Sequence, residues 1–213
     1  MGKIGLLIIL VLGLGTFFLT SQSFKQHEQQ NSQANQHRST WIDDTGKLHT
    51  MGLVLGESTV RDAELILRSR SDAAIFMYPE SKQGNEQRFR LELEAYFPSI
   101  ADHSKIMLVL NIKAEELEQI RQRGTSPRIY PNGVARVNLA NEDTLSIKQF
   151  TFNELRLVPS VQLDASMLEA RFGKPQSVQR NNDGSVRYLY PKLGLKALIN
   201  PDAKDVLSFS SAK

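Results

Sequence analysis

The sequence predicts an α+β protein, with tandem helix-plus-antiparallel-meander repeats after an N-terminal transmembrane helix. Three observations support this prediction: an uncharged apolar run near the N-terminus, two short segments with helix-capping residues, and several stretches of alternating apolar and polar residues. The 213 residues are 40% apolar and 23% charged, which is typical of globular proteins and excludes collagen, mostly disordered chains and multi-span membrane proteins. Because the chain has no cysteine, disulfide scaffolds, thiolate zinc sites, iron–sulfur clusters, cysteine nucleophiles and cysteine lipidation are excluded.

The first expected element is the run Ile4–Thr20, which has 17 residues and no charge. As a helix it would span roughly 26 Å, close to the thickness of the hydrocarbon core of a bilayer. Two interpretations are open, a cleaved signal peptide and an uncleaved anchor. The run is longer than the apolar core of most signal peptides, and Ser21-Gln22-Ser23 is a poor substitute for an Ala-x-Ala cleavage site. We therefore expect residues 1–20 to form a transmembrane signal anchor.

Residues 21–40 have a different composition, with six Gln, two Asn and two His. A segment this poor in apolar residues cannot bury enough surface to order itself, so we expect a flexible Gln-rich linker over 21–40. His27 and His37 are interpreted as polar residues of this linker rather than as metal ligands. The early position of the apolar run favours a single-pass protein of the inner membrane, whose domain faces the periplasm, although Lys3 before the run and Lys25 after it give little charge asymmetry.

The first α+β repeat, with a following helix, is expected over residues 41–125. Residues 59–62 (Thr-Val-Arg-Asp) can cap a helix that runs to about Leu67. Strands are expected at 73–78 and at 88–97, where Phe89, Leu91, Leu93, Ala95 and Phe97 share one face and Arg88, Arg90, Glu92 and Glu94 share the other. A third strand is expected at 105–112. The charged segment 114–123 is predicted to be a helix that contacts the core through Leu117 and Ile120.

The second α+β repeat is expected over residues 126–213, with strands at 134–139 and 144–152. Asp164 is a suitable N-cap for a helix that Gly173 and Pro175 end. Strands at 176–180 and 185–190 flank an Asn-Asn-Asp-Gly turn, which is a strong hairpin signal. Further strands at 195–199 and 205–210 complete an antiparallel meander against the helix.

Part of this second segment resembles a known family. The run Leu168–Val178 with its Gly173-Lys174-Pro175, followed by Asp183-Gly184 and by Tyr188–Leu195, is similar to the repeat of SmpA/BamE-like lipoproteins and β-lactamase-inhibitor-like domains. The segment Met51–Thr59 resembles the opening of that repeat, where a glycine precedes a capped helix. The resemblance implies a fold of helix-plus-meander repeats and a function that works through protein contacts. The chain departs from the family because it has no cysteine to be lipidated, so we expect it to be anchored by its membrane span rather than by a lipid.

Motifs for enzymatic chemistry are missing from the sequence. It has no G-x-S-x-G, H-E-x-x-H, P-loop or G-x-G-x-x-G pattern. His49 and His103 are isolated in sequence. A Ser-His-Asp triad stays an open alternative because triads assemble from distant positions, but the neighbours Asp102 and Ser104 are no evidence for one, and a solvated loop is favoured for His103. The sequence therefore assigns no catalytic, cofactor-binding or metal-binding residue, and it implies no cofactor.

The charge balance limits the partners. Removing Lys3, Lys25, Arg38 and Glu28 leaves 23 basic and 22 acidic residues in 41–213, so no excess charge favours nucleic acid. We expect a membrane-anchored bacterial envelope protein that touches the membrane through residues 4–20 and binds an envelope protein through its extracytoplasmic domain. An envelope hydrolase on an unfamiliar scaffold is the alternative. A pocket that gathers His49 or His103 with carboxylates would favour the enzyme, and an open sheet face would favour the binding module.

Overall fold

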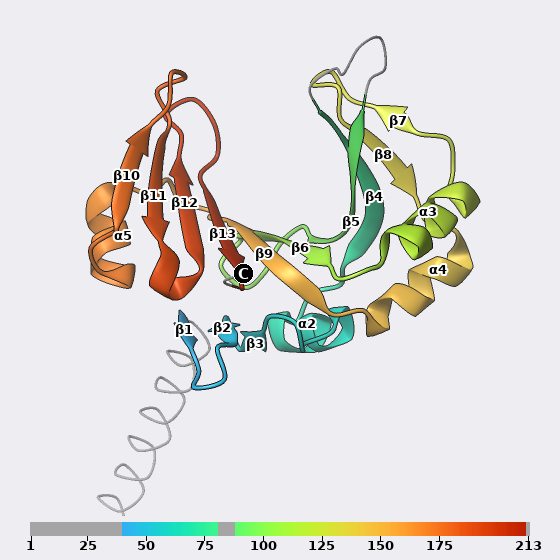
Figure 1. Cartoon of the computed structure of the whole chain (residues 1–213), viewed down its shortest axis with the longest axis horizontal. Helices are drawn as coiled ribbons and strands as arrows, with labels where there is room; N and C mark the ends of the chain where they lie inside the picture. Colours follow the sequence, from blue (N-terminus) through green and yellow to red (C-terminus); the bar gives the residue numbers. More distant parts are fainter. Residues whose placement is uncertain (1–39, 81–87, 212–213) are drawn as a thin grey trace, which may run out of the picture. The chain divides into compact units, whose positions relative to one another are not determined.

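The computed structural model describes residues 40–80 and 88–211. These residues form a three-stranded sheet, a ten-stranded sheet and four α-helices (Figure 1). The small sheet contains β1 (Thr40–Ile42), β2 (Leu48–Thr50) and β3 (Leu53–Val54). The helices are α2 (Val60–Leu67), α3 (Ala114–Arg123), α4 (Asn141–Ser146) and α5 (Ala165–Phe172), and short 3₁₀ turns are η1 (Ile147–Gln149) and η2 (Pro191–Leu193).

The large sheet is antiparallel throughout, which confirms the α+β class. Its strands lie in the order β10-β11-β12-β13-β9-β6-β5-β4-β8-β7. Their bounds are β4 (Asp72–Pro79), β5 (Phe89–Phe97), β6 (Lys105–Leu110), β7 (Arg128–Ile129), β8 (Ala135–Asn138), β9 (Phe152–Val158), β10 (Ser177–Arg180), β11 (Val186–Tyr190), β12 (Leu195–Ile199) and β13 (Val206–Ser210).

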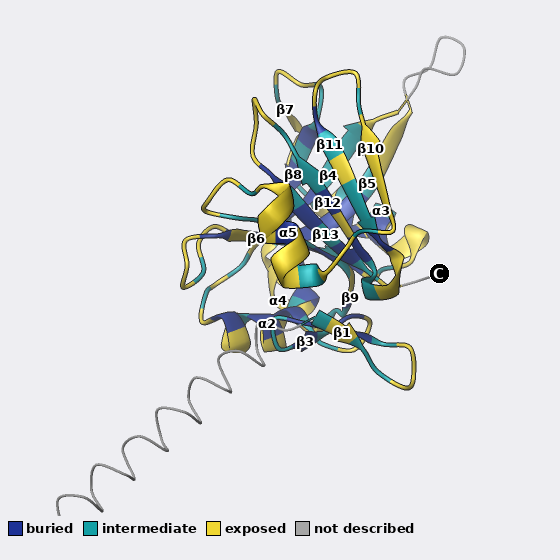
Figure 2. Cartoon of the chain, turned by 90° about the vertical axis from the view of Figure 1, so that its left-hand side faces the viewer, coloured by how far each residue is buried: buried dark blue, intermediate teal, exposed yellow. Residues whose placement is uncertain are grey.

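The C-terminal part of the sheet follows the sequence signals closely. The Asp164 carboxylate accepts the first-turn amide of Met167, and α5 ends before Gly173, as predicted. The four strands β10 to β13 pair consecutively as an antiparallel meander, and the hairpin between β10 and β11 turns through residues 181–184. Burial rises from the exposed edge strand β10 to the inner strands β12 and β13 (Figure 2).

The predicted capped helix near residue 60 is confirmed. Thr59 and Asp62 form a reciprocal capping box at the start of α2, and Val60, Ala63 and Leu67 are buried. Next come β4, β5 and β6, close to the predicted ranges 73–78, 88–97 and 105–112, and α3 covers residues 114–123 with Leu117 and Ile120 buried, also as predicted.

The predicted strand over 144–152 is wrong. Residues 141–149 instead form α4 and η1, and the strand β9 begins only at Phe152. Acidic residues in the first turn suit a helix start, and Asp143 is buried there in an ion pair with Arg123, whose Nη2 lies 2.6 Å from Asp143 Oδ1. Leu145 and Ile147, two positions apart, resemble the apolar alternation of a strand, but they do not share a buried face. Ile147 is buried, whereas Leu145 is 72% exposed.

Strand β9 joins the two parts of the sheet. It pairs with β6 on one side and with β13 on the other, so a strand from the C-terminal half of the chain lies at the centre of the sheet. Strands β7 and β8 also follow residue 125, yet β8 pairs with β4. The sheet is therefore continuous across the expected boundary between residues 125 and 126.

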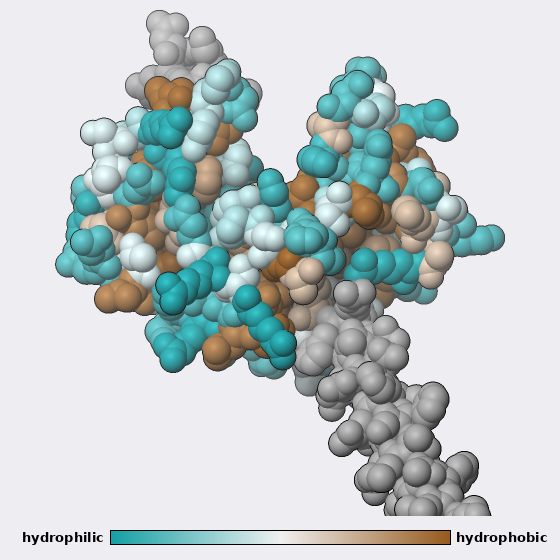
Figure 3. Space-filling model, turned by 180° about the vertical axis from the view of Figure 1, so that it is seen from behind, coloured by the Kyte–Doolittle hydropathy of each residue, from teal (hydrophilic) through white to brown (hydrophobic). Residues whose placement is uncertain are grey.

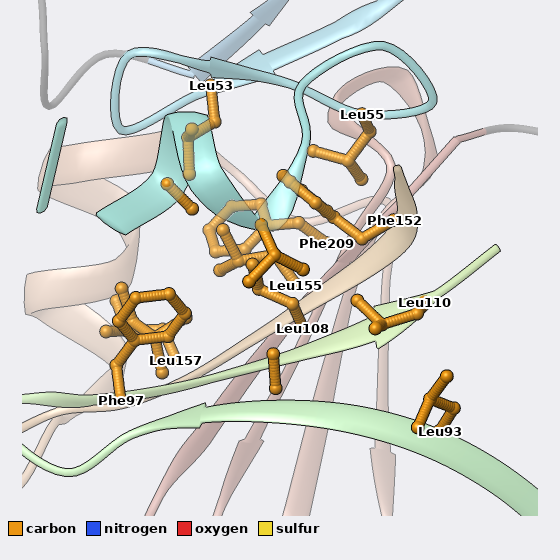
Figure 4. Packing of buried hydrophobic residues seen from close by; sticks show 14 of the residues in the cluster. Leu53, Leu55, Leu93, Phe97, Leu108, Leu110, Phe152, Leu155, Leu157 and Phe209 are labelled. Atoms are coloured by element: carbon orange, nitrogen blue, oxygen red, sulfur yellow. The ribbon is translucent and has the colours of Figure 1, made fainter. Parts of the chain in front are cut away.

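The core lies on one face of the large sheet. Its buried residues come from the strands of the sheet and from α2, α3, η1 and α5. Leu48 and Leu53 of the small sheet and Leu55 of the loop that follows it complete the cluster. Leu108, Leu155 and Phe209 lie together near the centre of this cluster, and Leu53 of β3 and Leu55 of the following loop lie above them in the view (Figure 4). The apolar face of β5, from Leu93 to Phe97, packs into the same cluster.

The expected membrane span at residues 4–20 and the expected linker, apart from Thr40, lie outside the described residues. Within 40–80 and 88–211, no helix is both long enough and apolar enough to cross a bilayer.

Candidate functional site

The second face of the large sheet carries the polar residues. Register places Glu94 of β5, Val109 of β6, Glu154 of β9 and Ser210 of β13 in one cross-strand row. A neighbouring row contains Arg156 of β9, Ser208 of β13 and Lys196 of β12. In Figure 1 the helices α3, α4 and α5 lie on the outer side of the curved sheet, away from this face. We call this second face the uncovered face.

A cleft of about 840 Å³ opens on the uncovered face. Its lining includes Glu92, Val109, Glu154, Leu189 and Lys196, so it spans the sheet from β5 to β11. The space-filling view from behind shows the hollow between the two ends of the sheet (Figure 3). A register shift between Val109 and Leu110 opposite β9 marks an irregularity in the ladder at this point, and bulges of this kind increase the local bend of a sheet. The cleft has the size of a small-molecule site and mixes apolar with charged groups.

Arg156 is the centre of a charged network below the cleft. Its Nε donates to Glu154 Oε1 over 2.8 Å, its Nη1 to Glu94 Oε1 over 3.0 Å, and its Nη2 to Glu92 Oε2 over 2.9 Å. The guanidinium thereby reaches across β6 and ties β9 to β5. Its side chain is only 17% exposed, so these three ion pairs are largely shielded from water.

Glu92 and Glu94 lie two residues apart on β5, on the same face, and have different surroundings. Glu92 pairs with two cations, Arg156 through Oε2 and Arg90 through Oε1. Glu94 is 2% exposed, and its Oε1 accepts both the Arg156 Nη1 donor and the Tyr78 hydroxyl, which lies 2.7 Å away. The two carboxylates therefore differ in their partners, since Glu92 pairs with two cations and Glu94 with one cation and one hydroxyl group.

The pKa values of Glu94, Tyr78 and Arg156 are shifted by these surroundings. Burial raises the pKa of Glu94 to about 7; the hydrogen bond from Tyr78 and the charge of Arg156 lower it, whereas Glu92 raises it. Burial also raises the pKa of Tyr78, and the neighbouring Glu94 carboxylate adds to this effect. Burial alone would lower the pKa of Arg156, but its bonds to Glu154 and Glu92 reverse this and raise it. Arg156 is thus a permanent cation, whereas the pKa of Glu94 lies close to neutral pH.

His49 lies in the small sheet, outside the cleft lining. Its ring stacks on Trp41, its cross-strand neighbour, with 4.6 Å between the ring centroids, and its Nε2 hydrogen-bonds to Asp43 Oδ2 over 2.8 Å. The same carboxylate group accepts the backbone amides of Thr45 and Lys47 through Oδ1. Hydrogen bonds from His49 and then from Thr45 lower the pKa of Asp43 well below its usual range. His49 therefore has one carboxylate partner, Asp43, and the same carboxylate closes the turn of the β1–β2 hairpin.

His103 is exposed and has a positive φ of 62°, in a turn before β6. The Asp102 carboxylate accepts the Ser104 amide over 3.0 Å, and the Ser104 hydroxyl accepts the Ser160 amide over 3.2 Å. The three neighbours therefore fix a turn, and the structure does not bring them together as a triad.

The sequence missed the residues that form the network. Alternation on β5 did place Glu92 and Glu94 on one face, which is a signal that two carboxylates would lie close together. Arg156 lies on β9, whose range the sequence did not predict, so nothing in the sequence pointed to their common partner. Among the described residues, no group of three or more His, Cys, Asp or Glu side chains is arranged to hold a metal ion.

Comparisons with protein-family models, with curated proteins and with solved structures found no significant match to this chain.

Proposed function

We propose that the chain is a membrane-anchored envelope protein whose α+β domain binds another envelope protein through the uncovered face of its large sheet. The observation that carries the proposal is the placement of the core: helices α2, α3 and α5 contribute buried residues to one cluster on one face, and the cleft with its charged network lies on the other face. An extended sheet face with a hydrophobic and charged hollow is a common site of protein recognition.

The same proposal includes the finer architecture. We interpret α2 with β4–β6, and α5 with β10–β13, as two helix-plus-meander repeats of the kind seen in SmpA/BamE-like and β-lactamase-inhibitor-like proteins. Both units place a capped helix before consecutive antiparallel strands. The central strand β9 would then be the connection that joins the repeats into one sheet.

Residues 1–20 would hold this domain at the inner membrane, with residues 21–40 as a spacer that raises its effective concentration near a membrane-bound partner. Intact-mass measurement on protein extracted from membranes tests this part. We expect residues 1–20 to be present, whereas a chain that begins near Phe24 would show cleavage and overturn the anchor.

Partner binding is tested by affinity purification of the full-length chain from the membranes of its native cells. Lys196→Glu adds an acidic group to the cleft that Glu92 and Glu154 also line, and we expect it to abolish capture of the partner. Lys204→Glu makes the same charge change in the loop before β13, outside this cleft, and should leave capture unchanged. Equal capture by both variants, with unchanged circular dichroism, would overturn binding at the cleft.

One observation favours the alternative of an envelope hydrolase. Two neighbouring carboxyl groups in different surroundings, Glu92 and Glu94, are the kind of pair that supplies acid–base catalysis. Glu92 lines the cleft, but it is held by two arginines. If the protein is an enzyme of this type, Glu92→Gln will abolish activity while partner capture persists. Joint replacement of His49 and His103 by Ala should leave the biological activity intact under either function.

A further inference from the structure

The Glu92–Glu94 pair has an arrangement suited to holding one proton between two carboxyl groups. Both Arg156 Nη1 and the Tyr78 hydroxyl donate to Oε1 of Glu94, at 3.0 Å and 2.7 Å. The other oxygen, Oε2, receives neither of these donors, and Glu92, two residues away on β5, accepts from Nη2 of the same Arg156 guanidinium. Two carboxylates can hydrogen-bond to each other only when one carries a proton. Oε2 of Glu94 is the position that such a proton would occupy, because Oε1 already accepts two donors.

Glu92 has more cationic partners than Glu94. Both of its oxygens are engaged by cations, Oε1 by Arg90 and Oε2 by Arg156, which stabilise its negative charge. Glu94 shares one of those cations and is almost completely buried, at 2% exposure. Ionising Glu94 would place a second buried negative charge beside the first, with Arg156 already divided among three carboxylates.

We propose that Glu94 is a proton-binding switch beneath the cleft, which is protonated and hydrogen-bonded to Glu92 in one state and ionised in the other. In the protonated state the network contains Glu92, Glu154, Arg90 and Arg156 as its charges, which balance. In the ionised state it carries one additional negative charge next to a wall of the cleft. Release of the proton would therefore change both the charge below the cleft and the hydrogen bonding that orients Glu92.

The charged groups on the strands around Glu94 influence how readily it ionises. Strand β6 places Val109 beside Glu94 and Met107 beside Tyr96, and its charged residue on this face, Lys105, lies two residues further along the strand. The charged and titratable groups on the uncovered face of β4, β5, β8, β9 and β12 near the network are Asp72, Tyr78, Arg90, Glu92, Tyr96, Arg136, Glu154, Arg156 and Lys196. Asp72 and Arg136 pair with each other at 2.7 Å, which leaves Arg156 as the cation bonded to Glu94.

The switch has a defined effect on folding. The folded-state pKa of Glu94, about 7, lies above the ordinary value of 4.5, so the folded chain binds more protons than the unfolded chain between these pH values. The free energy of unfolding therefore falls as pH rises through this interval and levels off above it. Each unit by which the folded pKa exceeds the unfolded one lowers the folding equilibrium constant tenfold at high pH.

The experiment uses the full-length chain in detergent and needs no partner. In ¹³C NMR of glutamate-labelled protein, we expect one side-chain carboxyl resonance to titrate near pH 7 and to disappear in Glu94→Gln. In denaturation series from pH 5 to pH 8, the stability of the wild-type chain should fall relative to that of Glu94→Gln. Gln keeps an oxygen for Tyr78 and Arg156 and an N–H for Glu92, so this variant mimics the protonated state at every pH.

Two further variants separate the switch from a purely structural role. Glu92→Gln should lower stability at all pH values and remove the titration near pH 7, since Glu94 loses its negative neighbour. Glu57→Gln, which alters an exposed pair with Lys47, should retain the wild-type pH dependence. A Glu94 resonance that titrates below pH 5, or a pH dependence in Glu94→Gln equal to that of the wild type, would overturn the switch.

Regulation of partner binding by this switch rests on the proposed function. If the cleft binds the partner, capture by the wild type should change between pH 6 and pH 8 while capture by Glu94→Gln stays constant. Failure of capture at every pH with an intact titration of Glu94 would contradict the proposed function alone, whereas constant capture by the wild type with an intact titration would contradict the regulatory link.

Discussion

The hydroxyl of Tyr78 donates to Oε1 of Glu94 over 2.7 Å, from β4 to β5, on the face of the sheet opposite the hydrophobic core. This bond extends the charged network of Arg156 and its three carboxylates from β5 to β4. Two of those carboxylates, Glu92 and Glu154, also line the cleft. A buried network of this kind specifies one arrangement of its strands, because any partner left without its bond has a high cost in free energy.

Arg156→Met should destabilise the domain strongly. It removes the only cation bonded to Glu94 among the described residues and leaves buried carboxylates without compensation, so we expect a loss of about 3 kcal/mol in the free energy of unfolding. The loss should be larger at pH 8 than at pH 5, because protonation relieves the uncompensated charge. Denaturant titrations at the two pH values measure this. Arg121→Met, which removes an exposed pair with Glu118 on α3, is the control and should have a small effect.

Gly194 is required by both its conformation and its surroundings. Its φ is +55°, and a Cβ added there would overlap the backbone oxygen of Ser210 and lie 3.1 Å from Leu48 Cδ2. Gly46 has a φ of +83° but no atom within 4 Å of such a Cβ. We expect Gly46→Ala to cost about 1 kcal/mol through strain alone and Gly194→Ala to cost roughly 1–3 kcal/mol more. Equal melting temperatures for the two variants would contradict this expectation, because they would show that the backbone near Gly194 and Ser210 shifts at little cost to accommodate the added Cβ.

Two tyrosines should respond oppositely to loss of their hydroxyl groups. The Tyr190 hydroxyl is buried and has no hydrogen-bond partner within the described part of the chain, so Tyr190→Phe should raise the free energy of unfolding by about 1 kcal/mol. Tyr78→Phe removes the donor to Glu94 and should lower it by about 1 kcal/mol. Chemical denaturation of both variants checks this. Destabilisation by Tyr190→Phe would show that its hydroxyl is bonded, for instance to a buried water.

Local signals predicted most of the helices and strands. The capping box at Thr59, the N-cap at Asp164 and the Asn-Asn-Asp-Gly hairpin each depend on neighbouring residues, and all three are present in the structure. The error over 144–152 arose because apolar residues two positions apart, Leu145 and Ile147, occur in a short helix as readily as in a strand. No local pattern distinguishes the two when a tertiary ion pair, here Asp143 with Arg123, favours the helix.

The candidate site could not be predicted from local sequence patterns, for a different reason. Arg156 meets Glu92 and Glu94 across more than sixty positions of sequence, and the contact exists only because β9 pairs with β6. Strand pairing of this kind is set by the packing of the whole core, which no single segment encodes. The sequence could show that two carboxylates share a face of β5, but not which cation would join them.

The most direct test of the central claim, that the uncovered face binds a partner, is site-specific photo-crosslinking in living cells. A photoreactive amino acid in place of Leu189 would lie on β11, where that residue lines the cleft; the same group in place of Arg61 would lie on the exposed side of α2. We predict one discrete cross-linked adduct from position 189 and none of that mass from position 61. No adduct at position 189, or the same adducts at both positions, would contradict the claim.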